Sequence, residues 1–364
     1  MRQISIRPNE AGQRFDKYLG KYLKKAPKSF LYKMLRKKNI TLNGKKATGQ
    51  EKLCAGDTVK LFLSDETIEK FSENLLPADL KTSENCRLDI LYEDAHTIFI
   101  NKPAGMLSQK AAPTDVSLVE HLISYLLESG QITREELATF RPSVCNRLDR
   151  NTSGIVAAGK TLPALQDLSL MFRDRTLGKY YLCLVKGNVA GSQRIDGYLS
   201  KDTSSNKVTL TKTERPEAVR IETEYRTLAA GDDCSLLEVH LITGKTHQIR
   251  AHLASIGHPI LGDYKYGDRK KNDPLRSRYG LKHQLLHSAR LIFPECEGAL
   301  AALSGKVIEA PLPDLFAEIC RGAGITLKDI GITSGNTEIP RAAAGICSGR
   351  IPDGTPAKRR KEQR

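Results

Sequence analysis

Apolar residues over positions 12–63 recur first at helical spacing and then in short strand-like runs. Such spacing predicts two short amphipathic helices. Residues 40–42 run into Asn43-Gly44, a dipeptide typical of hairpin turns, and a further strand is expected over 59–63. The segment therefore predicts a compact domain of two helices and a small sheet. The apolar stripes of the two helices are Phe15, Leu19 and Leu23, then Leu31, Met34 and Leu35.

The region 87–325 contains many strand-like segments and few helical ones. Many strands with few intervening helices favour an α+β domain with a central, mostly antiparallel mixed β-sheet. Helical spacing of apolar residues is restricted to 118–127, 162–175 and 246–256. Strand-like runs occur at 98–100, 155–158, 179–187, 217–228, 234–243 and 288–294.

Polar stretches suggest where the domains end. Residues 64–85 are polar and contain Pro77, which predicts a linker. We place the first domain over 12–72, the linker over 73–86 and the central domain over 87–325. Residues 326–364 are rich in Gly, Pro, Thr and Ala and end in AKRRKEQR, which predicts a flexible basic tail.

The charge of the chain is concentrated at its two ends. The 364 residues carry a formal charge of +15, of which residues 1–63 hold +12 and residues 341–364 hold +5, while 64–340 hold −2. Concentrated basicity of this kind favours a polyanionic partner, either nucleic acid or an anionic membrane surface. No apolar run reaches the roughly 20 residues that a membrane span needs. The first residues show no apolar signal segment, so a secreted protein is not expected.

The cysteines and histidines give little support for a metal site. The eight cysteines are widely and irregularly spaced, and none forms a C-x-x-C pair. We expect reduced thiols in a cytoplasmic protein. His247 and His252 have the spacing of two ligands on one helix, but no third ligand stands out, so no zinc site is predicted.

A first candidate for chemistry is the segment 146–154, NRLDRNTSG. Asp149 lies between Arg147 and Arg150, and neighbouring cations favour the ionised form of a carboxylate. An ionised, positioned aspartate can act as a nucleophile or a base. The residues alone leave open a surface turn in which Asp149 caps backbone amides and the arginines are solvated.

Two further segments carry candidate site residues. On the strand 178–187, Tyr181 shares a face with Cys183 and Val185, and its ring could lie beneath a nucleobase or simply pack in the core. In 241–253, Thr246 is a plausible helix N-cap, and His247 and Arg250 are neighbours three residues apart on that helix. An arginine there could pair with a carboxylate through two hydrogen bonds.

Taken together, these segments resemble the RluA-type pseudouridine synthases. The motifs NRLDRNTSG, K-x-Y-x-x-x-V-x-G and TGKTHQIRAH occur in the order and spacing of that family. LYEDAHTIFINKPAG upstream, and GHPILGDYKYG and LLHSARLIFP downstream, match the same family. The basic domain 12–72 resembles the S4 RNA-binding domain, so the likeness covers about residues 12–325. A solvated basic helix pair without a partner is the alternative for the basic domain.

The resemblance implies an isomerase that converts uridine to pseudouridine in folded RNA. It implies Asp149 as the nucleophile, Arg250 as its ion-pair partner, and Tyr181 as the residue that packs on the uracil. Arg147 would enter the space that the flipped uridine leaves. Many family members have histidine where this chain has Asn146, and we assign no role to that position. Whether Asp149 attacks the sugar or the uracil stays open.

The resemblance also implies the partners. The S4-like domain and the form of the RLDRNTSG motif favour the RluC-like group, which acts on 23S large-subunit ribosomal RNA, over enzymes that act on tRNA. No cofactor, metal or membrane is expected, and the enzyme is expected to be a monomer. We expect the S4-like domain to bind RNA through Lys33, Arg36, Lys37, Lys38, Lys45 and Lys46.

Two other hypotheses remain for the whole chain. One is an RNA-binding assembly factor that has lost activity, against which the intact Asp149, Tyr181 and Arg250 speak. The other is a hydrolase that uses Asp149 with His247 or His252, for which no nucleophile motif such as G-x-S-x-G is present.

Overall fold

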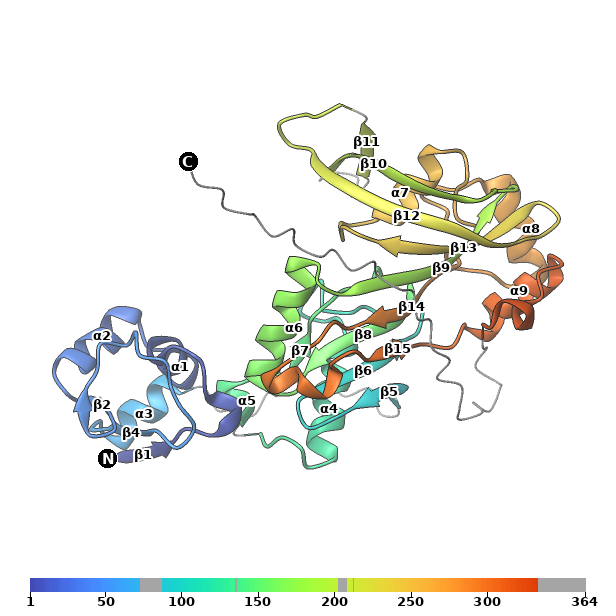
Figure 1. Cartoon of the computed structure of the whole chain (residues 1–364). Coiled ribbons are helices and arrows are strands. Elements are labelled where there is room, and N and C mark those ends of the chain that lie inside the picture. The colour runs from blue at the N-terminus through green and yellow to red at the C-terminus, as the bar shows by residue number, and fades with distance from the viewer. Residues whose placement is uncertain (73–86, 135, 202–207, 212, 333–364) are drawn as a thin grey trace, which may run out of the picture.

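The computed structural model describes residues 1–72, 87–134, 136–201, 208–211 and 213–332 (Figure 1). A small N-terminal domain lies to one side of a larger domain built on one long sheet, next to helices α5 (Glu136–Thr139) and α6 (Leu162–Asp174). Within the described residues, no helix is both long and apolar enough to span a membrane.

The N-terminal domain has the two predicted helices and a four-stranded sheet in the order β1-β4-β2-β3. Both predicted apolar stripes are buried in its core. Asn43 and Gly44 have φ angles of 50° and 74°, the left-handed pair that a tight hairpin turn requires. The elements are β1 (Arg2–Ser5), η1 (Pro8–Glu10), α1 (Phe15–Tyr22), α2 (Lys28–Arg36), β2 (Ile40–Leu42), β3 (Lys45–Lys46), β4 (Thr58–Leu61) and α3 (Asp65–Phe71).

This domain extends beyond the predicted helices and strands at both ends. β1 pairs with β4, so the sheet begins before residue 12. The polar stretch that starts at residue 64 opens with α3, where a linker was predicted. Ser64 caps this helix by accepting a hydrogen bond from the N–H of Thr67, and Ile68 is fully buried. Phe71 packs on Phe30 with a distance of 4.7 Å between ring centroids. The predicted linker 73–86 lies outside the described residues.

The larger domain is α+β, as predicted, with a mostly antiparallel mixed sheet. The strand order is β11-β10-β12-β13-β9-β14-β8-β6-β5, with β15 on β14 and β7 on β8. Only β14 and β8 pair in parallel among the described strands. The strands are β5 (Ile90–Glu93), β6 (Thr97–Lys102), β7 (Ser143–Val144), β8 (Ser153–Gly159), β9 (Gly178–Lys186), β10 (Ser192–Lys201), β11 (Val208–Thr211), β12 (Val219–Ala230), β13 (Cys234–Leu241), β14 (Leu286–Ile292) and β15 (Val307–Glu309).

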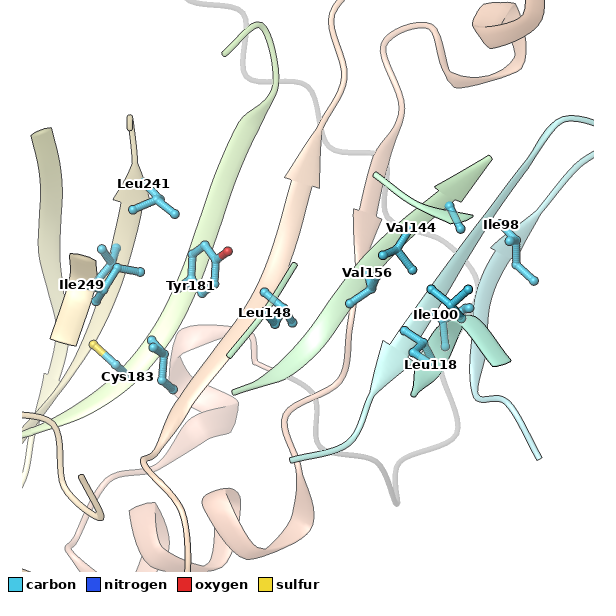
Figure 2. Close-up of a cluster of buried hydrophobic side chains, with 14 of the residues drawn as sticks. Ile98, Ile100, Leu118, Val144, Leu148, Val156, Tyr181, Cys183, Leu241 and Ile249 are labelled. Atoms are coloured by element: carbon cyan, nitrogen blue, oxygen red, sulfur yellow. The ribbon is translucent and has the colours of Figure 1, made fainter. Parts of the chain in front are cut away.

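Helices cover the two faces of this sheet, and buried hydrophobic clusters lie on both of its sides. On β9, Tyr181, Cys183 and Val185 belong to one core, together with residues of α4 and α7 (Figure 2). Leu182 and Leu184 point to the opposite face and pack with α9. The alternation predicted for this strand is therefore correct. The helices are α4 (Leu118–Glu128), α7 (Gln248–Ser255), α8 (Arg269–Tyr279), η2 (Gly298–Leu303), α9 (Asp314–Gly322) and η3 (Leu327–Ile330).

The packed chain continues past the predicted end of the central domain. Leu327 is buried in the core beneath α9, and η3 contacts that helix. The predicted tail over 326–364 therefore starts too early, because its first apolar residues still cover the sheet. Residues 333–364 lie outside the described part of the chain.

A polar contact joins the two domains. Glu10 is 5% exposed, accepts a hydrogen bond from the hydroxyl of Thr139, and also accepts one from the N–H of Arg7. The guanidinium of Arg7 forms an ion pair with Glu136 at 3.2 Å. The N-terminal domain is thus docked on α5 by named side chains.

Candidate active site

The loop that carries Asp149 is held on both sides by the segment that follows β6. The hydroxyl of Ser108 accepts a hydrogen bond from the N–H of Leu148 (3.1 Å) and donates one to its carbonyl (3.0 Å). The carbonyl of Arg150 accepts from the N–H of Gly105 at 2.8 Å. Asp149 lies between these two anchored residues, and its side chain is 26% exposed. These hydrogen bonds therefore fix the backbone position from which the side chain of Asp149 extends.

A buried lysine adds to this anchorage. Lys102 has no exposed surface, and its ammonium donates to the carbonyls of Pro103 and Met106 at 2.9 Å and of Arg150 at 3.2 Å. Burial lowers the pKa of Lys102 to about 8, while the negative charge of Asp149 opposes that shift. The NKPAG segment thus ties the Asp149 loop to the end of β6.

The TSG end of the same motif joins two strands. Gly154 has a φ of 108°, and a Cβ at this position would overlap the backbone carbonyl of Ser288 on β14. Only glycine allows β8 to approach β14 this closely. Ser153 meets His287 of β14 through a 2.8 Å hydrogen bond. The motif therefore carries Asp149 on its loop and also fixes the close packing of β8 against β14.

Arg250 connects two carboxylates. Its Nη1 donates to Oδ2 of Asp149 at 2.9 Å. Its Nε and Nη2 donate to the two oxygens of Asp263 at 2.7 and 3.0 Å, a bidentate pair. Because Asp263 accepts from two of the three guanidinium nitrogens, Nε and Nη2, the remaining nitrogen, Nη1, is directed toward Asp149.

The electrostatics support a permanently charged Arg250–Asp263 pair. Burial alone would lower the pKa of Arg250, but Asp263 and Asp149 outweigh it and raise that pKa. Burial would raise the pKa of Asp263, but Arg250 and the backbone N–H groups of Lys265 and Tyr266 hold it below its usual value. Arg250 and Asp263 are therefore charged at neutral pH, although their side chains are only 9% and 1% exposed.

His247 also faces Asp149. It begins α7 in a left-handed conformation with a φ of 55°, so the N-cap is His247 and the prediction of Thr246 is wrong. Its Nε2 lies 3.7 Å from Oδ2 of Asp149, and its Nδ1 is 2.9 Å from the hydroxyl of Tyr266. Burial lowers the pKa of His247, so the neutral imidazole is favoured at neutral pH.

Tyr181 lies in the core that backs the site. It is 8% exposed and belongs to the same cluster as Leu148 and Ile249, which are labelled beside it in Figure 2. Burial raises the pKa of Tyr181 to about 12, and the negative charge of Asp149 adds to the shift. The phenol is therefore protonated at neutral pH.

A cavity of about 490 Å³ opens in front of Asp149. Its walls include Asp149, Arg250 and Asp263, and its described lining residues carry four cations against these two carboxylates. Such a cavity attracts an anionic ligand. The remaining cations of the wall are Arg150, Lys265 and Lys282.

The other predicted residues lie apart from this cavity. Arg147 is exposed and is not among the lining residues. The cation that pairs with Asp149 is Arg250 from α7 rather than either arginine beside it in sequence. His252 is fully buried and bonds Thr223 at 2.7 Å. The six basic residues predicted to bind RNA are all exposed on the N-terminal domain: Lys33, Arg36, Lys37, Lys38, Lys45 and Lys46.

The described residues contain no group of three or more His, Cys, Asp and Glu side chains placed to hold a metal ion. Six cysteines fall within them, all free, and three are buried. Cys54 is exposed.

Sequence reasoning missed Asp263. It lies in the GHPILGDYKYG segment, which supported the family resemblance without a role for any of its residues. The available signal was a carboxylate that follows Leu261 and Gly262 in a run of apolar and small residues, where a charged side chain needs a partner. That the partner is Arg250 depends on tertiary structure.

Comparisons with known proteins identify the family of this chain. Residues 96–255 match the family model for RNA pseudouridylate synthase. The ribosomal large subunit pseudouridine synthase C of Vibrio cholerae is 34% identical over 298 residues, which cover 80% of this chain and 88% of that protein. The protein of the same name from Escherichia coli K12 is 32% identical over 295 residues with the same coverage.

A solved structure shows the same fold. The human RNA pseudouridylate synthase domain containing 4 aligns with a TM-score of 0.51 at 22% identity, and covers 64% of this chain and 91% of that one. The matched region holds Asp149, Tyr181 and Arg250. By its sequence likeness to these relatives, the chain belongs to the RNA pseudouridine synthase family of isomerases.

Proposed function

We propose that this enzyme converts specific uridines of 23S large-subunit ribosomal RNA to pseudouridine, with Asp149 as the nucleophile. The observation that carries the proposal is the carboxylate of Asp149, held by Arg250 at the wall of a cavity rich in cations. Relatives that align with 80% of this chain are named as ribosomal large subunit enzymes, which supports ribosomal RNA as the substrate.

The reaction rearranges bonds within one nucleotide. The N1–C1′ glycosidic bond breaks, the C5–C1′ bond forms, C5 loses a proton and N1 gains one. Asp149 would form a transient covalent bond to the nucleotide, which is released when the new C–C bond is complete. The atoms balance without an oxidant, a reductant or a second substrate.

Arg250 and Tyr181 would serve this step in different ways. Arg250 would hold the carboxylate of Asp149 in position at the cavity wall through its hydrogen bond. Tyr181 would pack on the uracil ring, a role that fits a buried phenol that is protonated at neutral pH. Arg147 is exposed on the same loop as Asp149, which is consistent with insertion into the RNA helix after the uridine has flipped out.

The N-terminal domain would hold the RNA. Its fold of two helices and a small sheet, and its net charge of +12 over residues 1–63, support an S4-like RNA-binding role. Phosphate contacts of this kind raise affinity without selecting the base. We further propose a monomeric enzyme that acts in the cytoplasm, where ribosomal RNA is the substrate.

Pseudouridine mapping tests the proposal. Purified enzyme is incubated with unmodified 23S ribosomal RNA and, separately, with tRNA, and new pseudouridines are mapped by sequencing. We expect modification of the ribosomal RNA by the wild type and none by Asp149→Ala or Asp149→Asn. Asp329→Asn, an exposed aspartate in η3, is the matched control and should retain full activity.

Three outcomes would overturn the proposal. Turnover by Asp149→Ala would remove Asp149 as the nucleophile. Modification of tRNA alone would replace the proposed substrate, and RNA binding without any modification would point to an inactive assembly factor.

A further inference from the structure

Lys179 is a buried cation that the reaction described above does not use. It lies on β9, its side chain is only 7% exposed, and it makes no side-chain hydrogen bond or ion pair with the residues that the structure describes. Lysine is almost never buried without a partner, because removing an ammonium from water is costly. A buried lysine without a protein partner therefore suggests that a bound ligand supplies its counter-charge.

The surroundings of Lys179 contribute positive charge, and no described carboxylate contacts its ammonium. A Cβ on Gly244, the exposed turn after β13, would lie 3.8 Å from Nζ of Lys179, so the ammonium reaches the surface beside that turn. Burial lowers the pKa of Lys179 to about 8, and the positive charge of Arg175 adds to this shift. Arg175 is exposed and ends α6 with a φ of 63°.

More cations lie around this pair. Arg194 and Arg220 form ion pairs with Glu222 at 2.5 and 3.0 Å. The same cations, with Arg175 as a weaker contributor, lower the pKa of Glu222. Lys245 follows Gly244 and is exposed. Within the described residues this patch holds five cations around one carboxylate, and that carboxylate is already shared by two arginines.

The patch lies next to the candidate active site. Lys179 is two residues before Tyr181 on the same face of β9, which corresponds to about 7 Å along a strand. The Gly244 turn leads directly into His247 and α7, which carries Arg250. A nucleotide bound against Tyr181 would bring its own backbone close to this patch.

We propose that Lys179 and Arg175 bind a phosphodiester group of the substrate RNA beside the flipped uridine. The inference rests on the proposed function for the identity of the ligand. The phosphate oxygens would supply the hydrogen-bond acceptors and the negative charge that Lys179 lacks in the free protein. The flexible ammonium would act as a point charge, and Arg175 would cover the phosphate from the solvent side.

The test compares RNA binding and stability in the same variants. Equilibrium binding of a ribosomal RNA fragment that contains a target uridine is measured at several salt concentrations, in the inactive Asp149→Ala background. We expect Lys179→Met to weaken binding about tenfold. The slope of log K against log salt should fall by about 0.7–0.9, the contribution of one phosphate contact. Lys179→Arg should keep most of the affinity because the charge is retained.

Stability separates a ligand site from a structural role. Since Lys179→Met removes a buried charge without a protein partner, its melting temperature should equal or exceed that of the parent. The matched control is Lys328→Met, an exposed lysine in η3, which packs with α9 on the opposite face of the sheet. It should change neither affinity nor salt slope.

Unchanged affinity and salt slope in Lys179→Met would overturn the inference, and so would a lowered melting temperature with normal binding. These results are independent of the proposed function. If the wild type forms no pseudouridine in ribosomal RNA, the proposed function fails, whereas active wild type with normal RNA binding by Lys179→Met defeats only the phosphate site.

Discussion

Arg250 shows how one side chain can organise a site. Its guanidinium is shared between Asp149 and Asp263, and Tyr266 lies 5.1 Å below it in a cation–π contact. Asp263 in turn accepts two backbone N–H bonds from its own loop. The carboxylate that accepts from Arg250 and directs its Nη1 toward Asp149 is thus itself held in place. Precise orientation of reacting groups supplies much of the rate that enzymes achieve.

We therefore predict that Asp263→Asn lowers kcat by about 10- to 100-fold and leaves KM for RNA nearly unchanged, because breaking a buried ion pair releases Arg250 from its orientation. Arg250→Leu should abolish turnover and misplace Asp149. Single-turnover kinetics with a ribosomal RNA fragment would measure both effects.

Asp273→Asn is the matched control for Asp263→Asn. Asp273 lies in α8 and accepts a hydrogen bond from Tyr264, the residue that follows Asp263. It makes no contact with Arg250. It should react at the wild-type rate. An Asp263→Asn enzyme with normal kcat would mean that Asp149 holds Arg250 in place unaided.

At the scale of elements, the sequence predicted the helices and strands whose apolar residues repeat at regular short spacing. The alternation on β9 and the apolar stripes of α1 and α2 identified strands and helices correctly, because burial of one face leaves a periodic signal. The loop at Asp149 was found through its motif. α3 was missed, since Ile68 and Phe71 provide only two apolar positions in a polar stretch.

Features that depend on distant partners could not be predicted from local patterns. The Asp263–Arg250 pair was missed, and the pair of Arg250 with Asp149 was expected only from the family resemblance. Asp263 and Arg250 are 13 residues apart, and Asp149 is 101 residues from Arg250. Their meeting depends on the sheet order, in which β14 separates β8 from β9. The N-cap at His247 depends on a left-handed backbone that its sequence does not demand.

The contact between β8 and β14 predicts how the fold responds to acid. His287 is fully buried between Ser153 and the carbonyl of Ala310, and burial lowers its pKa to about 4. Below pH 6.5 His287 binds a proton in the unfolded chain but not in the folded one. The free energy of unfolding therefore falls as the pH falls toward 4. At pH 5 this costs about 2 kcal/mol.

Urea unfolding of wild type and His287→Gln at pH 7 and pH 5 would measure this term. The loss of unfolding free energy between the two pH values should be about 2 kcal/mol smaller in His287→Gln. His96→Gln, an exposed histidine before β6, should behave as the wild type does. Equal pH dependence in all three proteins would show that His287 does not carry the effect.

At the scale of the whole molecule, positive charge is divided among separate surfaces. The N-terminal domain carries the largest excess, and the cavity at Asp149 and the patch at Lys179 carry smaller ones. The polar contact between Glu10 and Thr139 places the N-terminal domain against α5. Charge on the remote domain should govern affinity, whereas charge near Asp149 should govern position.

We predict that replacing the six basic residues of the N-terminal domain by glutamine weakens binding of long ribosomal RNA at least tenfold and flattens its salt dependence, because several phosphate contacts are lost. The rate of the bound complex should stay near the wild-type value. Binding measured across salt concentrations, with single-turnover rates at saturating enzyme, would separate the two effects. Unchanged affinity would assign the basic surface another role. The six residues are Lys33, Arg36, Lys37, Lys38, Lys45 and Lys46.

The place of β14 in the sheet has a consequence for biosynthesis. β14 ends at Ile292, yet it fills the position between β9 and β8, which are complete more than 100 residues earlier. Until β14 emerges from the ribosome, those two strands lack their shared neighbour and present open edges, which invite aggregation. The N-terminal domain is complete by residue 71 and has no such dependence. A nascent chain could therefore acquire the basic surface of its N-terminal domain long before Asp149 and Arg250 are brought together.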